Sequence, residues 1–163
     1  MKEKYDVPIA PQSEFVSYMM EQMSRFGLPC TEEQAKDFYM YYAHMIETNK
    51  YLNLTGITDM KEVVVKHMID SLSCYDSEII KSGMTIIDVG TGAGFPGIPL
   101  AIYDRSLKVT LFDSLKKRLT FLESIIDKLK LTNCTTLHGR AEDLSHQDYR
   151  ESFDIATSRA VAR

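Results

Sequence analysis

A glycine-rich segment directly after a short apolar run constrains the fold of this chain more than any other feature. The run Ile86–Val89 has the length and composition of a buried strand, and Gly90, Gly92 and Gly94 follow it at alternate positions. A helical stretch begins at Gly97. The order strand, glycine turn, helix is typical of folds that bind a nucleotide-like ligand, because glycine allows a positive φ and lets a ligand lie against the backbone.

An acidic residue inside this strand narrows the class of ligand. By spacing alone, Gly92-x-Gly94-x-x-Gly97 also fits the dinucleotide fingerprint, which would indicate an NAD-dependent oxidoreductase. Asp88 places a carboxylate at the ligand end of the strand, where it would repel a pyrophosphate and suit a ligand that carries an ammonium group. Pro96 also argues against an NAD site, so the oxidoreductase is the less favoured alternative.

The pattern along the chain divides it into three parts. Residues 1–12 predict a flexible tail with Pro8 and Pro11 as breakers, and residues 13–82 predict an N-terminal helical cap. Residues 83–163 alternate strands and helices, which predicts the first part of a Rossmann-like α/β domain with strands at 85–89, 108–112, 134–138 and 153–156. We expect a parallel sheet in which the fourth strand lies beside the first, giving the order 3-2-1-4. The last strand falls close to Arg163, so we expect the sheet to be incomplete at the C-terminus.

Capping residues and apolar spacing predict the helices. Ser13 is the expected cap of a helix that Gly27 ends, and Thr31 opens a second helix with a capping box. A third helix is expected from Asp59 towards Leu72. In the α/β part, the helices are expected at 97–103 and 115–129.

Composition excludes several classes of function. No apolar run approaches the roughly 20 residues of a membrane span, and the N-terminus lacks the apolar segment of a secretory signal. Cys30, Cys74 and Cys134 are widely spaced and never form CxxC, which predicts reduced structural thiols and no metal site. We therefore expect a cytoplasmic protein that binds neither a membrane nor a metal.

Three more groups of residues follow the expected strands, at the sheet edge where such folds bind ligands. Asp113 ends the second strand and can accept both hydroxyls of an adenosine ribose; an ordinary helix cap is the alternative. The segment 138–143 follows the third strand, and a loop there can line an adenine. Arg159 follows the fourth strand, where a surface ion pair is the alternative. The basic run Lys116–Arg118 fits either a solvated helix face or a phosphate-binding patch.

Six segments together carry a more specific resemblance. They are Asn53-Leu54-Thr55, Lys66-His67 with Asp70-Ser71-Leu72, the run from Asp88 to Leu100, Asp113-Ser114-x-x-Lys117-Arg118, Gly139-Arg140-Ala141-Glu142, and the run from Ser158 to Arg163. With these segments the chain resembles the RsmG/GidB family, bacterial methyltransferases that act on N7 of a guanine in small-subunit (16S) ribosomal RNA. The resemblance covers about residues 12–163, and family members continue well beyond Arg163.

The resemblance implies a Rossmann-like class I fold that binds S-adenosylmethionine. Family contacts with this cofactor match Gly90, Phe95, Asp113, Ser114, Ala141, Glu142 and Arg159, to which the glycine turn adds Asp88, Gly92 and Gly94. The expected RNA contacts are Lys117, Arg118 and Arg140, with Arg159 as a further candidate.

The resemblance also bears on mechanism and partners. No catalytic base is expected, because guanine N7 carries a lone pair and no proton, and positioning can supply the catalysis. The implied partner is ribosomal RNA or a ribosomal particle, and the full-length form is expected to be a monomer. A truncated, non-catalytic module that binds S-adenosylmethionine or RNA is the other alternative.

Overall fold

The computed structural model describes residues 6–145, 149 and 151–159. The chain divides into two compact units, 1–70 and 71–163. This boundary comes earlier than residue 82, where the sequence places the end of the helical cap. The segment that leads to the first strand instead packs within the second unit, where the hydroxyl of Tyr75 donates to Asp104 Oδ2 at 3.0 Å.

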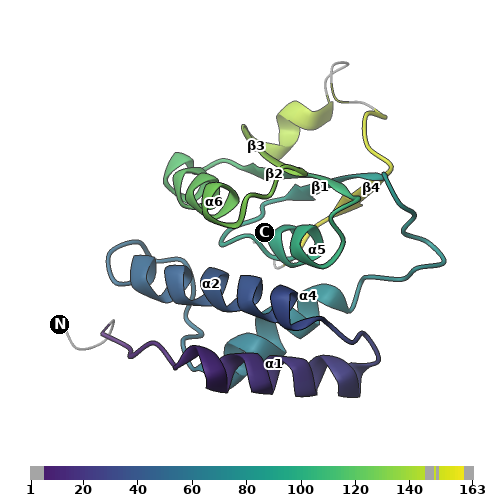
Figure 1. Ribbon diagram of the computed structural model, residues 1–163. Helices are drawn as coiled ribbons and strands as arrows, with labels where there is room; N and C mark the ends of the chain where they lie inside the picture. The colour runs from purple at the N-terminus through teal and green to yellow at the C-terminus, as the bar shows by residue number, and fades with distance from the viewer. Residues whose placement is uncertain (1–5, 146–148, 150, 160–163) are drawn as a thin grey trace. The chain divides into compact units, whose positions relative to one another are not determined.

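The first unit is helical. Its elements are α1 (Gln12–Phe26), α2 (Glu32–Asn49), α3 (Met60–Glu62) and the π-helical run η1 (Val63–Ile69), which α4 (Asp70–Leu72) continues into the second unit (Figure 1). Apolar side chains at helical spacing form its core, and Phe15, Phe38 and Met45 are completely buried. No helix among the described residues is long and apolar enough to cross a membrane.

Of the helix caps predicted for this unit, those at Thr31 and Gly27 are present and the one at Ser13 is not. Thr31 accepts a hydrogen bond from the Gln34 N–H while the Gln34 side chain accepts from the Thr31 N–H, so the capping box is confirmed. Gly27 ends α1 at φ +86°, as expected. The cap predicted at Ser13 is wrong: the N-cap is Pro11, two residues earlier, and no side chain caps α1.

The described part of the predicted flexible tail is attached to α2. The Ala10 N–H donates to the Tyr42 hydroxyl at 3.0 Å, and the Tyr39 hydroxyl donates to the Ala10 carbonyl at 2.8 Å. Tyr42 also stacks on Phe15, with ring centroids 5.1 Å apart. These tyrosines therefore pack inside the helical unit.

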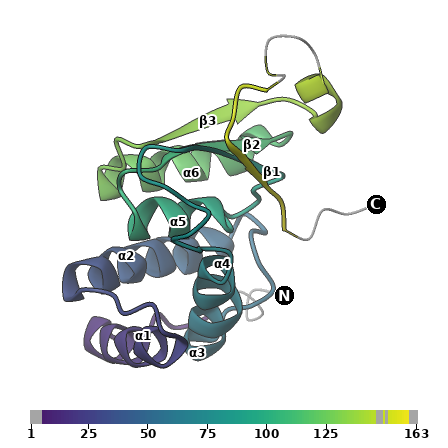
Figure 2. The same ribbon diagram turned by 90° about the vertical axis from the view of Figure 1, so that its right-hand side faces the viewer.

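The second unit is a Rossmann-like α/β sheet. Its elements are β1 (Thr85–Val89), α5 (Gly97–Tyr103), β2 (Lys108–Asp113), α6 (Lys116–Leu129), β3 (Cys134–His138), the 3₁₀ turn η2 (Ala141–Ser145) and β4 (Ile155–Thr157). All paired strands are parallel, and the order β3-β2-β1-β4 confirms the expected topology. Helices α5 and α6 lie on the same face of the sheet (Figure 1, Figure 2).

The sheet topology positions the site. Strand order reverses at β1, because the chain crosses from β1 to β2 on one side and later places β4 on the other side. The register pairs Asp88 with Leu111 and Asp113 with His138, so the carboxyl ends of the strands lie together at one edge. Ligands of open α/β sheets bind at such a switch point, outside the carboxyl ends of the strands.

Candidate functional site

The backbone of the glycine turn is anchored to strand β2. The N–H groups of Gly90 and Thr91 both donate to the carbonyl of Phe112, at 2.9 and 3.0 Å. Gly90, Gly92 and Gly94 have φ values of 67°, 60° and 109°. Residues that carry a Cβ atom rarely adopt these backbone φ values, so glycine is needed at these three positions. The glycine turn that the sequence predicts is therefore present.

Two glycines here are needed for different reasons. A Cβ atom added at Gly92 would meet no heavy atom within 4 Å, so space over the turn is open. A Cβ atom at Gly97 would overlap Leu111 and come within 2.9 Å of Asp88 Oδ2. Gly92 therefore leaves the backbone accessible to a ligand, whereas Gly97 lets α5 start against the strands.

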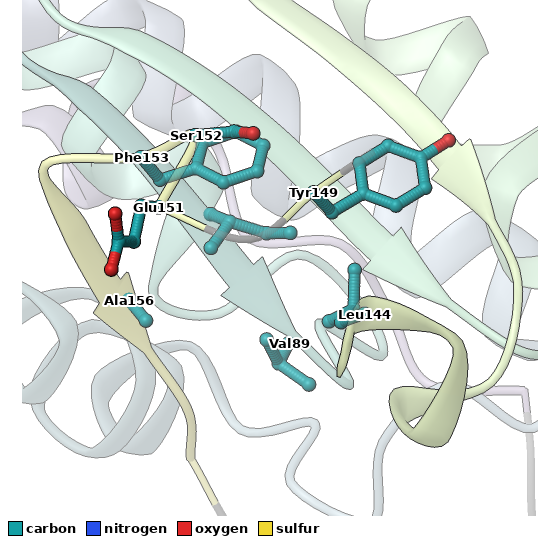
Figure 3. A pocket seen from close by; sticks show the side chains of 8 residues that line it. Val89, Leu144, Tyr149, Glu151, Ser152, Phe153 and Ala156 are labelled. Carbon is teal, nitrogen blue, oxygen red and sulfur yellow. The ribbon is translucent and has the colours of Figure 1, made fainter. Parts of the chain in front are cut away.

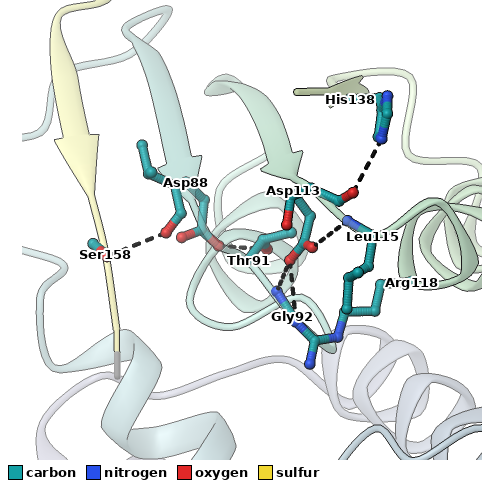
Figure 4. Close-up of polar contacts among 10 residues, drawn as sticks. Asp88, Thr91, Gly92, Asp113, Leu115, Arg118, His138 and Ser158 are labelled. Atoms are coloured by element: carbon teal, nitrogen blue, oxygen red, sulfur yellow. Dashed lines mark hydrogen bonds and ion pairs between the residues drawn. The ribbon is translucent and has the colours of Figure 1, made fainter. Parts of the chain in front are cut away.

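The Asp88 carboxylate lies completely buried beneath the turn. Its Oδ2 atom accepts a hydrogen bond from the Thr91 hydroxyl at 2.6 Å (Figure 4) and another from the Gly97 N–H at 2.9 Å. Burial raises the pKa of Asp88 to about 7, against the opposing effects of these hydrogen bonds and of the Arg159 charge. In the structure this carboxylate holds the turn through Thr91 and Gly97, and its predicted role toward a cationic ligand stays a prediction.

Asp113 connects the glycine turn with the start of α6. Its Oδ2 accepts from the Gly92 N–H and its Oδ1 from the Leu115 N–H, each at 2.9 Å, and only 2% of the residue is exposed (Figure 4). Arg118 Nη1 lies 3.6 Å from the same Oδ2. Asp113 is not the helix cap that the alternative describes, because the N-cap of α6 is Leu115 and no side chain caps it. Asp113 instead orders the turn before α6 and lies against the glycines.

The end of β3 is bonded to the same region. The Gly139 N–H donates to the Asp113 carbonyl at 3.2 Å, and His138 Nε2 lies 3.1 Å from the Ser114 carbonyl oxygen. The chain then enters η2, whose first residues Ala141 and Glu142 are exposed. The loop expected to line an adenine therefore starts beside Asp113.

The end of β4 reaches the turn from the other side. The Ser158 hydroxyl donates to the Val89 carbonyl at 3.2 Å. The Arg159 guanidinium lies 5.3 Å from the centroid of the Phe95 ring, and its Nη1 donates to the Ser71 hydroxyl at 3.1 Å. Residues 160–163 of the predicted motif lie outside the described residues.

The structure thus brings most of the predicted cofactor residues to the carboxyl-terminal edge of the sheet. The predicted RNA-binding residues differ in whether their charge faces solvent or an acidic side chain. Lys117 and Arg140 are exposed, as a surface contact requires. Arg118 differs, because its guanidinium points back to Asp113 (Figure 4). Among the described residues, no group of histidines, cysteines and acids could hold a metal ion.

Sequence reasoning missed two residues that order the site. Thr91 is 2% exposed and binds Asp88; a hydroxyl three residues after a buried acid, inside a turn, is the signal that could have identified it. Ser71 is 1% exposed and binds Arg159, 88 residues later in the chain. No local pattern reports a contact over that separation.

A separate cavity of about 210 Å³ lies between the sheet and the segment before β4 (Figure 3). Strand residues Ile87, Val89 and Ala156 line it with Leu144, Tyr149 and other side chains of the segment before β4. Because side chains alternate along a strand, Ile87 and Val89 point to the face opposite Asp88. None of the predicted cofactor residues lines this cavity, so it is distinct from the glycine-turn site.

Comparison with known proteins gives consistent matches. The sequence profile of the family described as rRNA small subunit methyltransferase G matches residues 34–163. The chain is 48% identical over 148 residues to the Ribosomal RNA small subunit methyltransferase G of Lachnoclostridium phytofermentans, covering 90% of this chain and 61% of the relative. It is 47% identical over 147 residues to the same-named protein of Leuconostoc mesenteroides, covering 88% of this chain and 62% of the relative.

A solved structure supports the fold. A Plasmodium falciparum chain, assigned as a protein-L-isoaspartate O-methyltransferase and crystallised with S-adenosyl-L-homocysteine, matches 91% of this chain and 74% of its own length. The TM-score is 0.51 and the sequence identity 19%. At this identity the match supports the Rossmann-like fold alone.

Proposed function

This chain belongs to the ribosomal RNA small subunit methyltransferase G family, and we propose that it transfers a methyl group from S-adenosylmethionine to N7 of a guanine in 16S ribosomal RNA. The observation that carries the proposal is the approach of Asp113 to the open glycine turn at Gly92, at the carboxyl ends of β1 and β2. The chain spans about 60% of the length of the curated relatives it matches, and their name supports the substrate class.

The residues present fit this cofactor. The open space over Gly92 admits a ligand to the backbone, and the Asp113 carboxylate offers acceptor oxygens for ribose hydroxyls. Ala141 and Glu142 follow β3 on the same side and would line the adenine. Arg159, over the Phe95 ring on the other side of the turn, would offer its guanidinium to the carboxylate of the amino-acid end.

The chain's own residues act by binding and positioning. When bound, S-adenosylmethionine supplies an electrophilic methyl group on its sulfonium. Guanine N7 has a free lone pair and no proton to lose, so no residue of the chain needs to act as a general base. We therefore assign no catalytic residue, and the rate would come from aligning the two groups.

The cysteines of this chain are poorly suited to the main alternative reaction, methylation at carbon 5 of a pyrimidine. Methylation at carbon 5 of a pyrimidine would need a cysteine nucleophile, which is reactive as a thiolate. Burial raises the pKa of the Cys134 thiol to about 12 and also raises the pKa of Cys30. The Cys74 thiol donates to the Ser71 carbonyl at 3.1 Å. These properties favour attack by an unprotonated ring nitrogen.

The RNA target would be an unpaired nucleotide. N7 is an acceptor in the major groove, and in A-form RNA this groove is too narrow for side chains. The exposed cations Lys117 and Arg140 follow the ends of β2 and β3 and would hold phosphates. A non-catalytic module that binds the cofactor or RNA is the alternative, and it would bind without transferring a methyl group.

Methyl transfer to undermethylated small ribosomal subunits tests the proposal. The protein is incubated with these subunits and S-adenosylmethionine, and modified bases are mapped by nuclease digestion and mass spectrometry. We expect 7-methylguanine at one position, and loss of most of this product with Asp113→Asn. Because the asparagine amide lacks one of the two acceptor oxygens that hold the Gly92 and Leu115 N–H groups, circular dichroism checks that this variant is folded at the assay temperature. Methylation of a pyrimidine or of protein would contradict the proposal.

A further inference from the structure

The carboxylate that would receive the cofactor's ribose is crowded by groups of the protein itself. A carboxylate has about four lone-pair positions, two on each oxygen. The Gly92 N–H and the Arg118 guanidinium both approach Oδ2 of Asp113, and the Leu115 N–H occupies a position on Oδ1. The two N–H groups each occupy one position, the guanidinium lies over Oδ2 as an ion-pair partner, and only 2% of Asp113 is exposed.

Two adjacent ribose hydroxyls need two acceptor positions on this carboxylate. Because only 2% of Asp113 is exposed, the hydroxyls cannot reach its oxygens until one of the present contacts moves aside. The geometry of the three contacts indicates which one yields.

The Arg118 contact is the most readily displaced. The Gly92 and Leu115 bonds are both 2.9 Å long and come from backbone groups that form the turn and the start of α6. The Arg118 contact is longer, at 3.6 Å, and 37% of this side chain is exposed. A flexible side chain that reaches solvent can leave without changing the fold, whereas the two N–H groups cannot.

We propose that Arg118 occupies the ribose-accepting carboxylate in the free protein and that the cofactor displaces it on binding. This inference rests on the proposed function, because it takes the cofactor's ribose to bind Asp113. The displaced guanidinium then extends from the first turn of α6 beside the exposed Lys116 and Lys117. Cofactor binding would thereby add a free positive charge to the surface where we expect RNA to bind.

Binding of S-adenosyl-L-homocysteine to Arg118→Met measures the competition. This product has no sulfonium charge, so a general change in protein charge affects it little. Removal of a competitor is expected to tighten binding about two- to fivefold, the range that corresponds to a partly exposed ion pair. Lys116→Met, which removes the same charge from the same helical turn, should leave the affinity unchanged. Isothermal calorimetry measures these affinities. Arg118→Gln, which also removes the charge but keeps a polar side chain, is a second variant for the same comparison.

A double-variant cycle shows whether the effect acts through Asp113. In an Asp113→Asn background, Arg118→Met should no longer change the affinity. Equal or weaker binding by Arg118→Met and Arg118→Gln in the wild-type background would overturn the inference and give Arg118 a supporting role. If the wild-type protein does not bind the product at all, the proposed function fails, and the inference fails with it.

Discussion

At the scale of single residues, the glycine turn is held by the buried carboxylate of Asp88. Asp88 binds Thr91 and Gly97, and burial raises its pKa to about 7. An aspartate that titrates near 3.8 when unfolded and near 7 when folded takes up a proton on folding between these pH values. The free energy of unfolding therefore falls as pH rises from about 4 to 7.

Asp88→Asn removes this titration while an amide oxygen remains to accept hydrogen bonds. We expect the wild-type protein to lose stability relative to the variant between pH 4 and pH 7, by on the order of 3 kcal/mol. Urea unfolding at several pH values measures the difference. Parallel pH profiles for the two proteins would contradict the raised pKa of Asp88.

Two glycine substitutions separate binding from folding. Gly92→Ala adds a methyl group in open space at φ +60°, so it should cost about 1 kcal/mol of stability and weaken S-adenosyl-L-homocysteine binding at least tenfold. Gly97→Ala overlaps Leu111 and should cost roughly 1–3 kcal/mol of stability. Thermal unfolding and calorimetry test both. The opposite ranking, with Gly92→Ala less stable and Gly97→Ala impaired mainly in binding, would show that the turn is assigned wrongly.

At the scale of secondary-structure elements, caps decide where the helices of the first unit begin. Thr31 makes both bonds of a capping box, whereas Ser13 makes no cap bond at the start of α1. Thr31→Ala should therefore lower the free energy of unfolding by about 1 kcal/mol. Ser13→Ala is the matched control and should change it by less than about 0.5 kcal/mol. Equal losses in the two variants, measured by urea unfolding, would count against this assignment.

The strands and the helices of the second unit could be predicted well because their signals are local. Apolar runs bounded by glycine and polar residues gave β1, β2 and β3 to within one residue, and β4 starts two residues after its expected position. The π-helical stretch Val63–Ile69 was not predicted, because its apolar spacing also fits an ordinary α-helix.

At the scale of the whole molecule, the sequence predicted which residues gather at the site but not how they pair. The parallel order β3-β2-β1-β4 follows from general rules of chain crossover, and it brings the turn and Asp113 together. The burial of Asp88, the Arg118 contact with Asp113 and the bond from Arg159 to Ser71 depend on side-chain positions in three dimensions. Local patterns carry no information about such pairings.

We propose that the glycine turn and the end of β2 form one site for an adenosine cofactor. The most direct test is a titration of ¹⁵N-labelled protein with S-adenosyl-L-homocysteine, followed through the amide signals of Gly90, Gly92, Gly94 and Leu115. We predict that these signals shift together and saturate, and that NADH leaves them unchanged. The claim would be contradicted if NADH shifted them and S-adenosyl-L-homocysteine did not, or if the homocysteine compound shifted only residues of the cavity beside Val89 and Leu144.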